Sequence, residues 1–205
     1  MKLEIIPKES NREEAFKLWM TSPMPMVTLT KTFDISRICR KSKQQGLKLN
    51  MLLCWCIGKA ASQVKEFYTL PENGKLYKYE TLAVNVIVNN SKGGINSCDI
   101  PYTNELSLFN TDYINMTEKV RRSCRSIFKE EHMIIGTSAM TATELDCIIN
   151  QYTDKFCNPM VMWGRYRKGW FKTTLPISFQ FHHVQMDGGH AAQFLEILQR
   201  TINEI

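Results

Sequence analysis

The C-terminal end of the chain carries the pattern that most limits its fold. From residue 174 to residue 181 every second side chain is large and apolar. Strict alternation of this kind predicts a strand with one buried face. The residues from 189 to 205 then place an apolar stripe along one side of a helix, made by Ala191, Phe194, Leu195, Leu198, Ile202 and Ile205. A half-buried strand followed by an amphipathic helix predicts a sheet that is covered by helices.

The rest of the chain changes between strand-like and helix-like segments. Alternation, or a high content of β-branched and aromatic residues, predicts strands over 24–33, 66–70, 75–89, 132–139 and 159–166. Helical spacing of apolar residues predicts helices over 11–20, 35–45, 51–64 and 117–129. Such a mixture without βαβ regularity favours the α/β class, as an α+β sandwich in which helices cover one face of a largely antiparallel mixed sheet.

Capping and turn residues mark several element ends. Asp34 stands where it can cap the helix that begins at residue 35, and Gly46 stands where that helix should end. Asn50 predicts a similar cap for the apolar helix that follows it. The pair Asn73-Gly74 between two β-like runs predicts a tight hairpin.

Length and composition predict one cytoplasmic domain. The chain has 205 residues and no linker or internal repeat, so we expect a single domain over 1–205. Its seven cysteines include no CxxC pair, which favours reduced thiols over a zinc site or a disulfide framework. We expect no membrane association, because no apolar run approaches the length of a signal peptide core or of a membrane span.

The net charge of +6 is spread along the chain. The densest basic stretches lie within 37–43, 119–125 and 165–168. A nucleic-acid-binding protein would more often gather these residues into one stripe, so we expect no nucleic-acid partner. Two interpretations stay open: solvated surfaces, or attraction of an anionic small molecule such as a phosphorylated cofactor.

The run from Phe181 to His190 is the most informative for chemistry. It follows the alternating strand and contains His182, His183 and Asp187, with two glycines after the aspartate. Glycines allow a tight turn and a close backbone approach. An imidazole, whose ordinary pKa is about 6.5, suits proton abstraction at neutral pH when such a turn presents it to a cleft. Asp187 can fix the turn or orient the ring.

Two other interpretations of this run are open. The histidines can be structural, stacked at the end of a strand. They can also form a metal site with Asp187 and His190. Consecutive strand residues point to opposite faces, however, so His182 and His183 cannot easily bind one ion. We expect no metal.

The extended motif LPISFQFHHVQMDGGH, over 175–190, resembles the active-site signature of chloramphenicol acetyltransferases. Dihydrolipoamide acyltransferases share its HxxxDG core. The resemblance covers nearly the whole chain: residues 12–35 follow the N-terminal pattern of the family, 65–76 look like its hairpin, and 164–169 resemble its GKY segment. The chain is therefore identified as similar to this family of CoA-dependent acyltransferases.

The resemblance implies transfer of an acetyl group from acetyl-CoA to the hydroxyl group of a small molecule, an antibiotic or another alcohol. His183 would act as general base in a ternary complex, without an acetyl-enzyme. Asp187 resembles a structural aspartate of the family that pairs with an arginine matching Arg12. The family also implies a homotrimer with active sites at the subunit interfaces.

The resemblance further implies an oxyanion donor and cofactor contacts. Ser138-Ala139 matches the start of a Ser-Ala-x-Pro-Trp segment, so Ser138 is the candidate donor, with Thr137 and Thr141 in reserve. The Pro-Trp part is missing, and its tryptophan normally packs on the cofactor. Tyr166 and Arg165 match a tyrosine and a basic residue near the cofactor tunnel, although both can equally be surface residues.

The acceptor pocket departs from the family pattern. Trp19 stands where the family has a tyrosine, while Val27 and Ile95 replace two pocket phenylalanines. We therefore expect the acetyl-transfer machinery to be kept and chloramphenicol to be a poor acceptor.

Two alternatives to this function remain. The first is the core of a lipoyl-dependent acyltransferase, which would normally carry an upstream lipoyl domain and linker, whereas this chain begins at the catalytic domain. The second is a pseudoenzyme that binds small molecules without turnover. Retention of His183, Asp187, Arg12 and Ser138 argues against the second.

Overall fold

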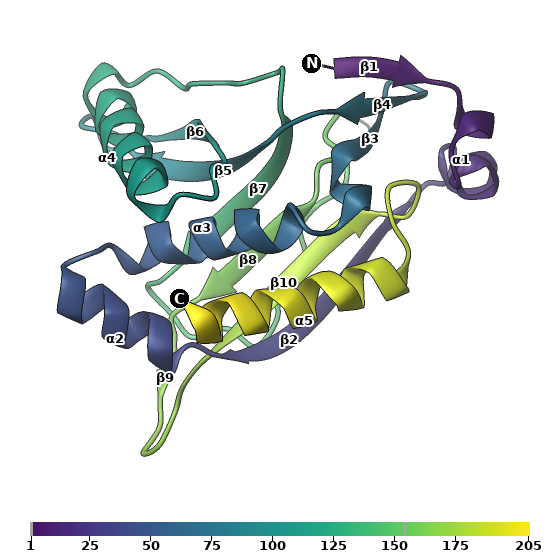
Figure 1. Ribbon diagram of the computed structural model, residues 1–205. Helices are drawn as coiled ribbons and strands as arrows, with labels where there is room; N and C mark the ends of the chain where they lie inside the picture. The colour runs from purple at the N-terminus through teal and green to yellow at the C-terminus, as the bar shows by residue number, and fades with distance from the viewer. Residues whose placement is uncertain (1, 154) are drawn as a thin grey trace.

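A seven-stranded mixed sheet forms the centre of the protein (Figure 1). The computed structural model describes residues 2–153 and 155–205. Across the sheet the strands lie in the order β2 (Met26–Asp34), β10 (Thr173–His182), β8 (Met160–Gly164), β7 (Met133–Met140), β5 (Leu82–Asn89) and β6 (Ile95–Pro101). The short β9 (Arg167–Lys168) pairs with the start of β10.

The strand directions confirm the expected mixed, largely antiparallel sheet. β7 lies parallel to its two neighbours, β5 and β8, and the other pairs are antiparallel. Parallel neighbours need a long connection. The chain supplies it between β5 and β7 through β6 and α4 (Leu106–Ser123), which packs on β6.

Three helices cover one face of this sheet, as Figure 1 shows: α2 (Ser36–Gln45), α3 (Leu49–Ala61) and α5 (Gly188–Glu204). The alternation in β10 decides which side chains meet them. Phe179 and Phe181 are fully buried, and the ring of Phe179 lies 4.6 Å from that of Phe194 on α5. We call this side of the sheet the helix face.

The opposite side, the open face, carries the polar half of the same alternation. Ser178 and Gln180 of β10 lie there, and the described residues of the segment 141–159 contact them through Ile148 and Asn150. The Ile148 amide donates to Ser178 Oγ at 2.9 Å, and Gln180 Nε2 donates to the Asn150 carbonyl at 3.1 Å. The described residues of this segment form no helix or strand.

A second, three-stranded sheet lies near the N-terminus. Its order is β1 (Lys2–Ile5), β4 (Lys75–Tyr79) and β3 (Thr69–Glu72). The turn between β3 and β4 has positive φ at Asn73 (49°) and Gly74 (76°), as a type I′ turn requires, so the predicted hairpin is confirmed. Short 3-10 turns, η1 (Pro7–Glu9) and η2 (Lys65–Tyr68), precede α1 (Glu13–Trp19) and β3.

The helix ends agree with the sequence in part. Gly46 ends α2 at φ 67°, as predicted. The N-cap of α2 is Ile35 rather than the predicted Asp34, although Asp34 accepts hydrogen bonds from the amide and the hydroxyl of Ser36. The prediction for Asn50 is wrong. It lies inside the first turn of α3, and its side chain donates to the Tyr113 hydroxyl at 3.0 Å instead of capping the helix.

Other expectations were also wrong. The helix predicted over 117–129 is the second half of α4, which begins at Leu106 and ends where Cys124 takes a left-handed φ of 54°. Its first turns bury only Phe109 and Tyr113, so they carry no dense apolar stripe. The strands β1 and β6 were not predicted. Among the described helices, none is both long and apolar enough for a membrane span.

Candidate active site

The histidine turn, residues 183–187, joins the end of β10 to the start of α5. Its entry is fixed by the His183 amide, which donates to the Pro25 carbonyl at 2.9 Å. Its exit is a capping box: Asp187 is the N-cap of α5, and its amide donates to Nδ1 of His190 at 3.2 Å. Both ends of the turn are therefore held by hydrogen bonds to other parts of the fold.

The two consecutive histidines have opposite environments. His182 is fully buried, and its Nδ1 accepts a hydrogen bond from the Val184 amide at 3.1 Å. Burial, with a smaller contribution from the nearby His183, lowers the pKa of His182 to about 4. His182 is thus neutral at physiological pH, whereas the His183 side chain keeps 30% of its surface exposed.

Trp19, at the end of α1, stacks on His183. The two ring centroids are 4.8 Å apart and the planes differ by 12°. Trp19 is one of the three acceptor-site candidates predicted from the sequence, and its ring lies directly on that of the candidate base.

The ring of His183 presents one nitrogen to the outside. Nδ1 is buried, lies 3.4 Å from Oδ1 of Asp187 and makes no hydrogen bond within residues 2–153 and 155–205. The carboxylate next to Nδ1 favours the tautomer with the proton on Nδ1. Nε2 is then the ring nitrogen that can accept a proton from a substrate.

Arg12 holds the turn from the N-terminal side. Its guanidinium binds both carboxylate oxygens of Asp187, at 2.6 and 2.8 Å. It also donates to the carbonyls of His183 at 2.6 Å and Val184 at 2.9 Å. Hydrogen bonding to Arg12 keeps the pKa of Asp187 below its usual value. The pairing that the resemblance implied is present, and it reaches the backbone of the candidate base.

The glycines of the motif do not serve the turn as expected. Gly188 and Gly189 form the first turn of α5 and have no positive φ. A Cβ added to either would have no atom within 4 Å. The chain's own conformation therefore does not require glycine here, and the space beside the helix start is open.

Ser138 lies on the open face of β7, away from His183. It pairs with Met162, which pairs with Ser178, and His183 comes five residues after Ser178. At about 3.3 Å per residue this is about 16 Å along the strand, before the sideways distance across two strand spacings is added. One chain does not bring the two residues together.

The two reserve candidates for the oxyanion donor, Thr137 and Thr141, differ from Ser138 in their hydrogen bonds and in their location. The Thr137 hydroxyl is buried and donates to the Asn85 carbonyl at 2.7 Å, so it is not available to a ligand. The Ser138 hydroxyl makes no hydrogen bond to any residue that the structure describes. Thr141 lies beyond the end of β7 and lines a cavity on the helix face.

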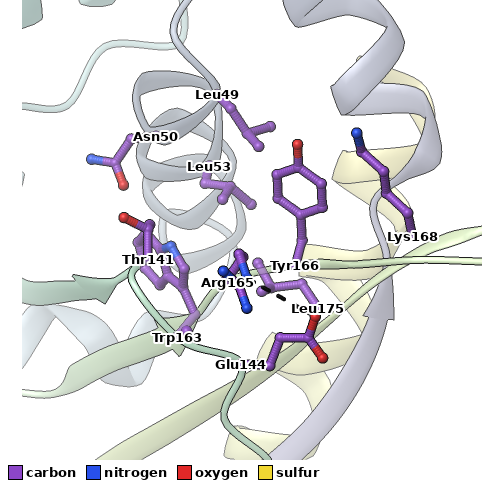
Figure 2. Close-up of a pocket in the computed structure, with 11 residues that line it drawn as sticks. Leu49, Asn50, Leu53, Thr141, Glu144, Trp163, Arg165, Tyr166, Lys168 and Leu175 are labelled. Carbon is purple, nitrogen blue, oxygen red and sulfur yellow. Dashed lines mark ion pairs between the residues drawn. The ribbon is translucent and has the colours of Figure 1, made fainter.

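This helix-face cavity has a volume of about 590 Å³ and opens beside the start of α3 (Figure 2). In Figure 2 the ring of Tyr166 lies across from Leu49 and Leu53, and a dashed line marks the ion pair between Arg165 and Glu144. Both residues expected near a cofactor tunnel thus line one cavity. Trp163 also lines it from β8.

A second cavity of about 610 Å³, the open-face cavity, lies on the other side of the sheet. Strand residues contribute to its floor, and the segment 141–159 and residues 128–130 contribute to its walls. Its lining comprises Met26, Asn85, Ile87, Ser97, Asp99, Phe128, Glu130, Ile134, Gly136, Asn150, Gln151, Thr153, Phe156, Asn158, Met160 and Gln180. Ser138 follows Gly136 by two residues on the same face of β7, so it borders this cavity.

The two other acceptor-site candidates lie outside this lining. Val27 pairs with Phe181 and packs, partly buried, against the core on the helix face. Its neighbour Met26 takes the position in the cavity. Ile95 is 69% exposed and lies on the open face of β6, two residues before Ser97.

Most of the open-face cavity could not be predicted from the sequence. Its residues come one or two at a time from strands and loops far apart in the chain. The available signal was polar residues inside otherwise apolar strands, such as Asn85, Asp99 and Gln180. Among the described residues, no three His, Cys, Asp or Glu side chains gather in a metal-binding arrangement.

Comparison with solved structures shows the class of fold. A chloramphenicol acetyltransferase superposes with a TM-score of 0.84 at 17% identity, over 98% of this chain and all of the other. A probable dihydrolipoamide acetyltransferase from Listeria monocytogenes superposes with a TM-score of 0.72 at 9% identity, over 96% and 93% of the two chains. The fold is that of the acyltransferases.

Sequence comparison gives the family. The chloramphenicol acetyltransferase family matches residues 3–199. Chloramphenicol acetyltransferase 2 of Escherichia coli is 24% identical over 95% of this chain and 94% of its own length. A chloramphenicol acetyltransferase of Clostridium perfringens is 27% identical over 99% and 100% of the two chains. The chain belongs to the chloramphenicol acetyltransferase family and is an acyltransferase.

Proposed function

We propose that this enzyme transfers the acetyl group of acetyl-CoA to a hydroxyl group of a small molecule, with His183 as the general base. The observation that carries the proposal is the position of His183: Nδ1 is buried against Asp187, while Nε2 is left for a substrate. A base must present one free nitrogen in a fixed orientation, and this arrangement meets that need.

The proposed reaction takes place in a ternary complex. Nε2 of His183 accepts the hydroxyl proton as the oxygen forms a bond to the thioester carbonyl carbon. The carbon–sulfur bond then breaks, and the leaving thiolate takes the proton back from the imidazolium to give CoA. The histidine is regenerated, and base catalysis of this kind contributes about 10²–10⁴-fold.

Arg12 and Asp187 act as positioning residues in this proposal. Arg12 binds the carbonyl of His183 and both oxygens of Asp187, so it ties the backbone of the base to the carboxylate beside its ring. A displacement of about 1 Å at a reacting group is enough to cost a large part of the rate. Their removal therefore affects turnover through His183.

We further propose a homotrimer in which one active site uses two chains. Ser138 suits an oxyanion donor because its hydroxyl is not engaged within the described residues, but it borders the open-face cavity far from its own His183. A site that contains both residues needs His183 from a second copy. Sedimentation equilibrium at micromolar concentration checks this, and a monomer there would contradict the two-chain site.

The helix-face cavity is the proposed site of CoA. Arg165 and Lys168 bring positive charge to its rim, and Leu49, Leu53 and Tyr166 give it an apolar wall, which suits a phosphorylated cofactor with an extended arm. The tryptophan missing after Ser138 has a substitute in Trp163, which pairs with Ala139 and lines the same cavity.

The decisive experiment measures release of free CoA with a thiol reagent while acetyl-CoA is offered with a panel of alcohols. We expect release that depends on the alcohol and is lost in His183→Ala. Binding of acetyl-CoA without release for every alcohol would favour the pseudoenzyme. Transfer to dihydrolipoamide alone would favour the lipoyl-type enzyme; because this acceptor carries thiols of its own, its acetylated product is detected by mass spectrometry instead of with the thiol reagent.

A further inference from the structure

The open-face cavity is acidic in a basic chain. Two carboxylates, Asp99 and Glu130, line it, and its lining contains no lysine or arginine among the residues described. The chain as a whole has a net charge of +6. The sign of the charge in this cavity is therefore opposite to that of the protein and would attract a cation.

The amide side chains of the cavity have their nitrogens engaged by the protein. Asn85 Nδ2 donates to Oδ1 of Asp99 at 2.6 Å, and Asn158 Nδ2 donates to the Ile134 carbonyl at 3.0 Å. No donor among residues 2–153 and 155–205 reaches the oxygen of either amide. Each amide thus leaves its oxygen, a hydrogen-bond acceptor, for a ligand.

Gln180 gives the strongest indication of a ligand. It is 1% exposed, and its Nε2 donates to the Thr28 hydroxyl at 3.0 Å and to the Asn150 carbonyl at 3.1 Å. A carbonyl can only accept, so the nitrogen must lie on that side and the amide cannot be reversed. Oε1 is buried without a donor in the described chain. A buried acceptor left unpaired is costly, and a ligand N–H would remove that cost.

Aromatic rings complete the walls. Phe128 and Phe156 line the cavity and are 66% and 70% exposed. Exposed rings beside carboxylates and amide oxygens suit an ammonium group, because a cation is attracted to the face of an aromatic ring. Apolar contact with these rings also allows a ligand that is partly hydrophobic.

We infer that the acceptor of this enzyme is an amino alcohol, a small molecule that carries a protonated amine near the hydroxyl to be acetylated. An ammonium group has three donors and no acceptor, which complements the carboxylates of Asp99 and Glu130 on one side of the cavity. The oxygen of Gln180 lies on the β10 side and suits a second donor group of the same ligand. The hydroxyl would point toward Ser138, at the border of the cavity. This inference rests on the proposed function and names the substrate class of that same site.

The test compares two alcohols that differ in the amine alone, phenylalaninol and 3-phenylpropan-1-ol. Initial rates of CoA release are measured for both, and NMR of the products distinguishes the ester from the isomeric amide of phenylalaninol. We expect kcat/KM to be at least about tenfold higher for phenylalaninol, mostly through KM, as the loss of a charge-assisted contact predicts. Equal values for the two alcohols would overturn the inference.

Matched variants locate the amine. Glu130→Gln should lower the preference for phenylalaninol by about two- to fivefold, the range for an ion pair with an exposed carboxylate. Glu131→Gln makes the same change next to it, outside the cavity lining, and should leave the preference unchanged. Asp99→Asn, which still can accept a hydrogen bond, should lower it further. A preference that survives both Glu130→Gln and Asp99→Asn would contradict the assignment.

Calorimetry separates this inference from the proposed function. If neither alcohol is acetylated, the proposed transfer to these hydroxyls fails, while binding of each alcohol to the protein with CoA still reports on the cavity. Tighter binding of phenylalaninol than of 3-phenylpropan-1-ol, weakened in Glu130→Gln, would support the cationic ligand by itself. Equal affinities would reject it.

Discussion

The histidine turn and the open-face cavity differ in how they are built. The turn is one short segment whose backbone is bound at both ends, with Arg12 reaching the carbonyls of His183 and Val184. The cavity collects side chains from several strands and two loops, and residues of its walls are exposed. In the proposed function, chemistry would therefore depend on a local pattern and selection of the acceptor on dispersed residues.

This difference has a consequence for variation. A change in the turn disturbs several hydrogen bonds at once, since one guanidinium makes four of them. A change in the cavity wall alters one contact with a ligand and leaves the strand that carries it in place. We expect large effects on turnover and stability from the turn, and smaller, substrate-dependent effects from the cavity.

The largest expected effect comes from the two histidines. His183→Ala should lower kcat by about 10²–10⁴-fold or more, as removal of a general base predicts. His182→Asn should keep most of the activity, because its side chain is fully buried and an asparagine oxygen can still accept from the Val184 amide. CoA release measures both, with circular dichroism to check folding. Equal losses in the two folded variants would contradict the assignment of the base.

The second prediction concerns the stability of the turn. Arg12→Met should destabilise the protein by about 3–5 kcal/mol, because it leaves Asp187 unpaired and two carbonyls without their donor. Asp187→Asn should cost less, about 1–3 kcal/mol, since Asp187 is 45% exposed and solvent can replace part of the contact.

Urea denaturation of both variants and of the double variant checks this second prediction. Because the two side chains share their hydrogen bonds, the double variant should lose about 0.5–3 kcal/mol less than the sum of the single losses. Additive losses would mean that the turn is held by other contacts.

The third prediction is a pH dependence from His182. Its pKa of about 4 in the folded protein lies below the ordinary value of 6.5, so the unfolded chain takes up the proton first as the pH falls. Stability is complete above about pH 6.5 and declines toward pH 4, by up to about 3 kcal/mol. Urea denaturation at pH 7 and pH 4.5 should show a smaller decline in His182→Asn. An equal decline in the two proteins would show that His182 does not control it.

The smallest expected effect concerns kcat/KM with chloramphenicol as the acceptor. The amides and carboxylates of the cavity make few favourable contacts with a nitroaromatic ring. We therefore expect kcat/KM for chloramphenicol to lie about ten- to a hundredfold below that of an efficient enzyme, near or under about 10⁵ M⁻¹s⁻¹. Ile95→Phe adds a ring on the open face and should lower KM for chloramphenicol without loss of stability. Val27→Phe, against the core, should instead destabilise by about 1–3 kcal/mol. Turnover of chloramphenicol near the diffusional limit would contradict this view of the cavity.

The sequence predicted the turn well for a physical reason. A strand with period two followed by HHxxxD places consecutive side chains on opposite sides, so the separation of His182 from His183 followed from geometry alone. The contact of Arg12 with Asp187 came only through the family resemblance, because 175 positions separate the two residues along the chain.

The cavity could not be predicted in the same way. Asn85 and Asp99 lie opposite each other on paired strands, Gln180 lines the same cavity from β10, and one-residue changes in register decide which face a side chain takes. Met26 lines the cavity, for example, whereas its neighbour Val27 packs against the core on the other face. The first half of α4 was missed because helix formation there depends on tertiary packing rather than on an apolar stripe.

The stack of Trp19 on His183 restricts how the imidazole can move. A ring covered on one face by an indole, with Nδ1 buried beside a carboxylate, cannot rotate about its χ2 angle without breaking both contacts. Its conformational entropy is lost when the protein folds rather than when a ligand arrives. Whatever reaction His183 serves, a ligand therefore meets a ring that is already oriented, and it must approach Nε2 within the plane of that ring.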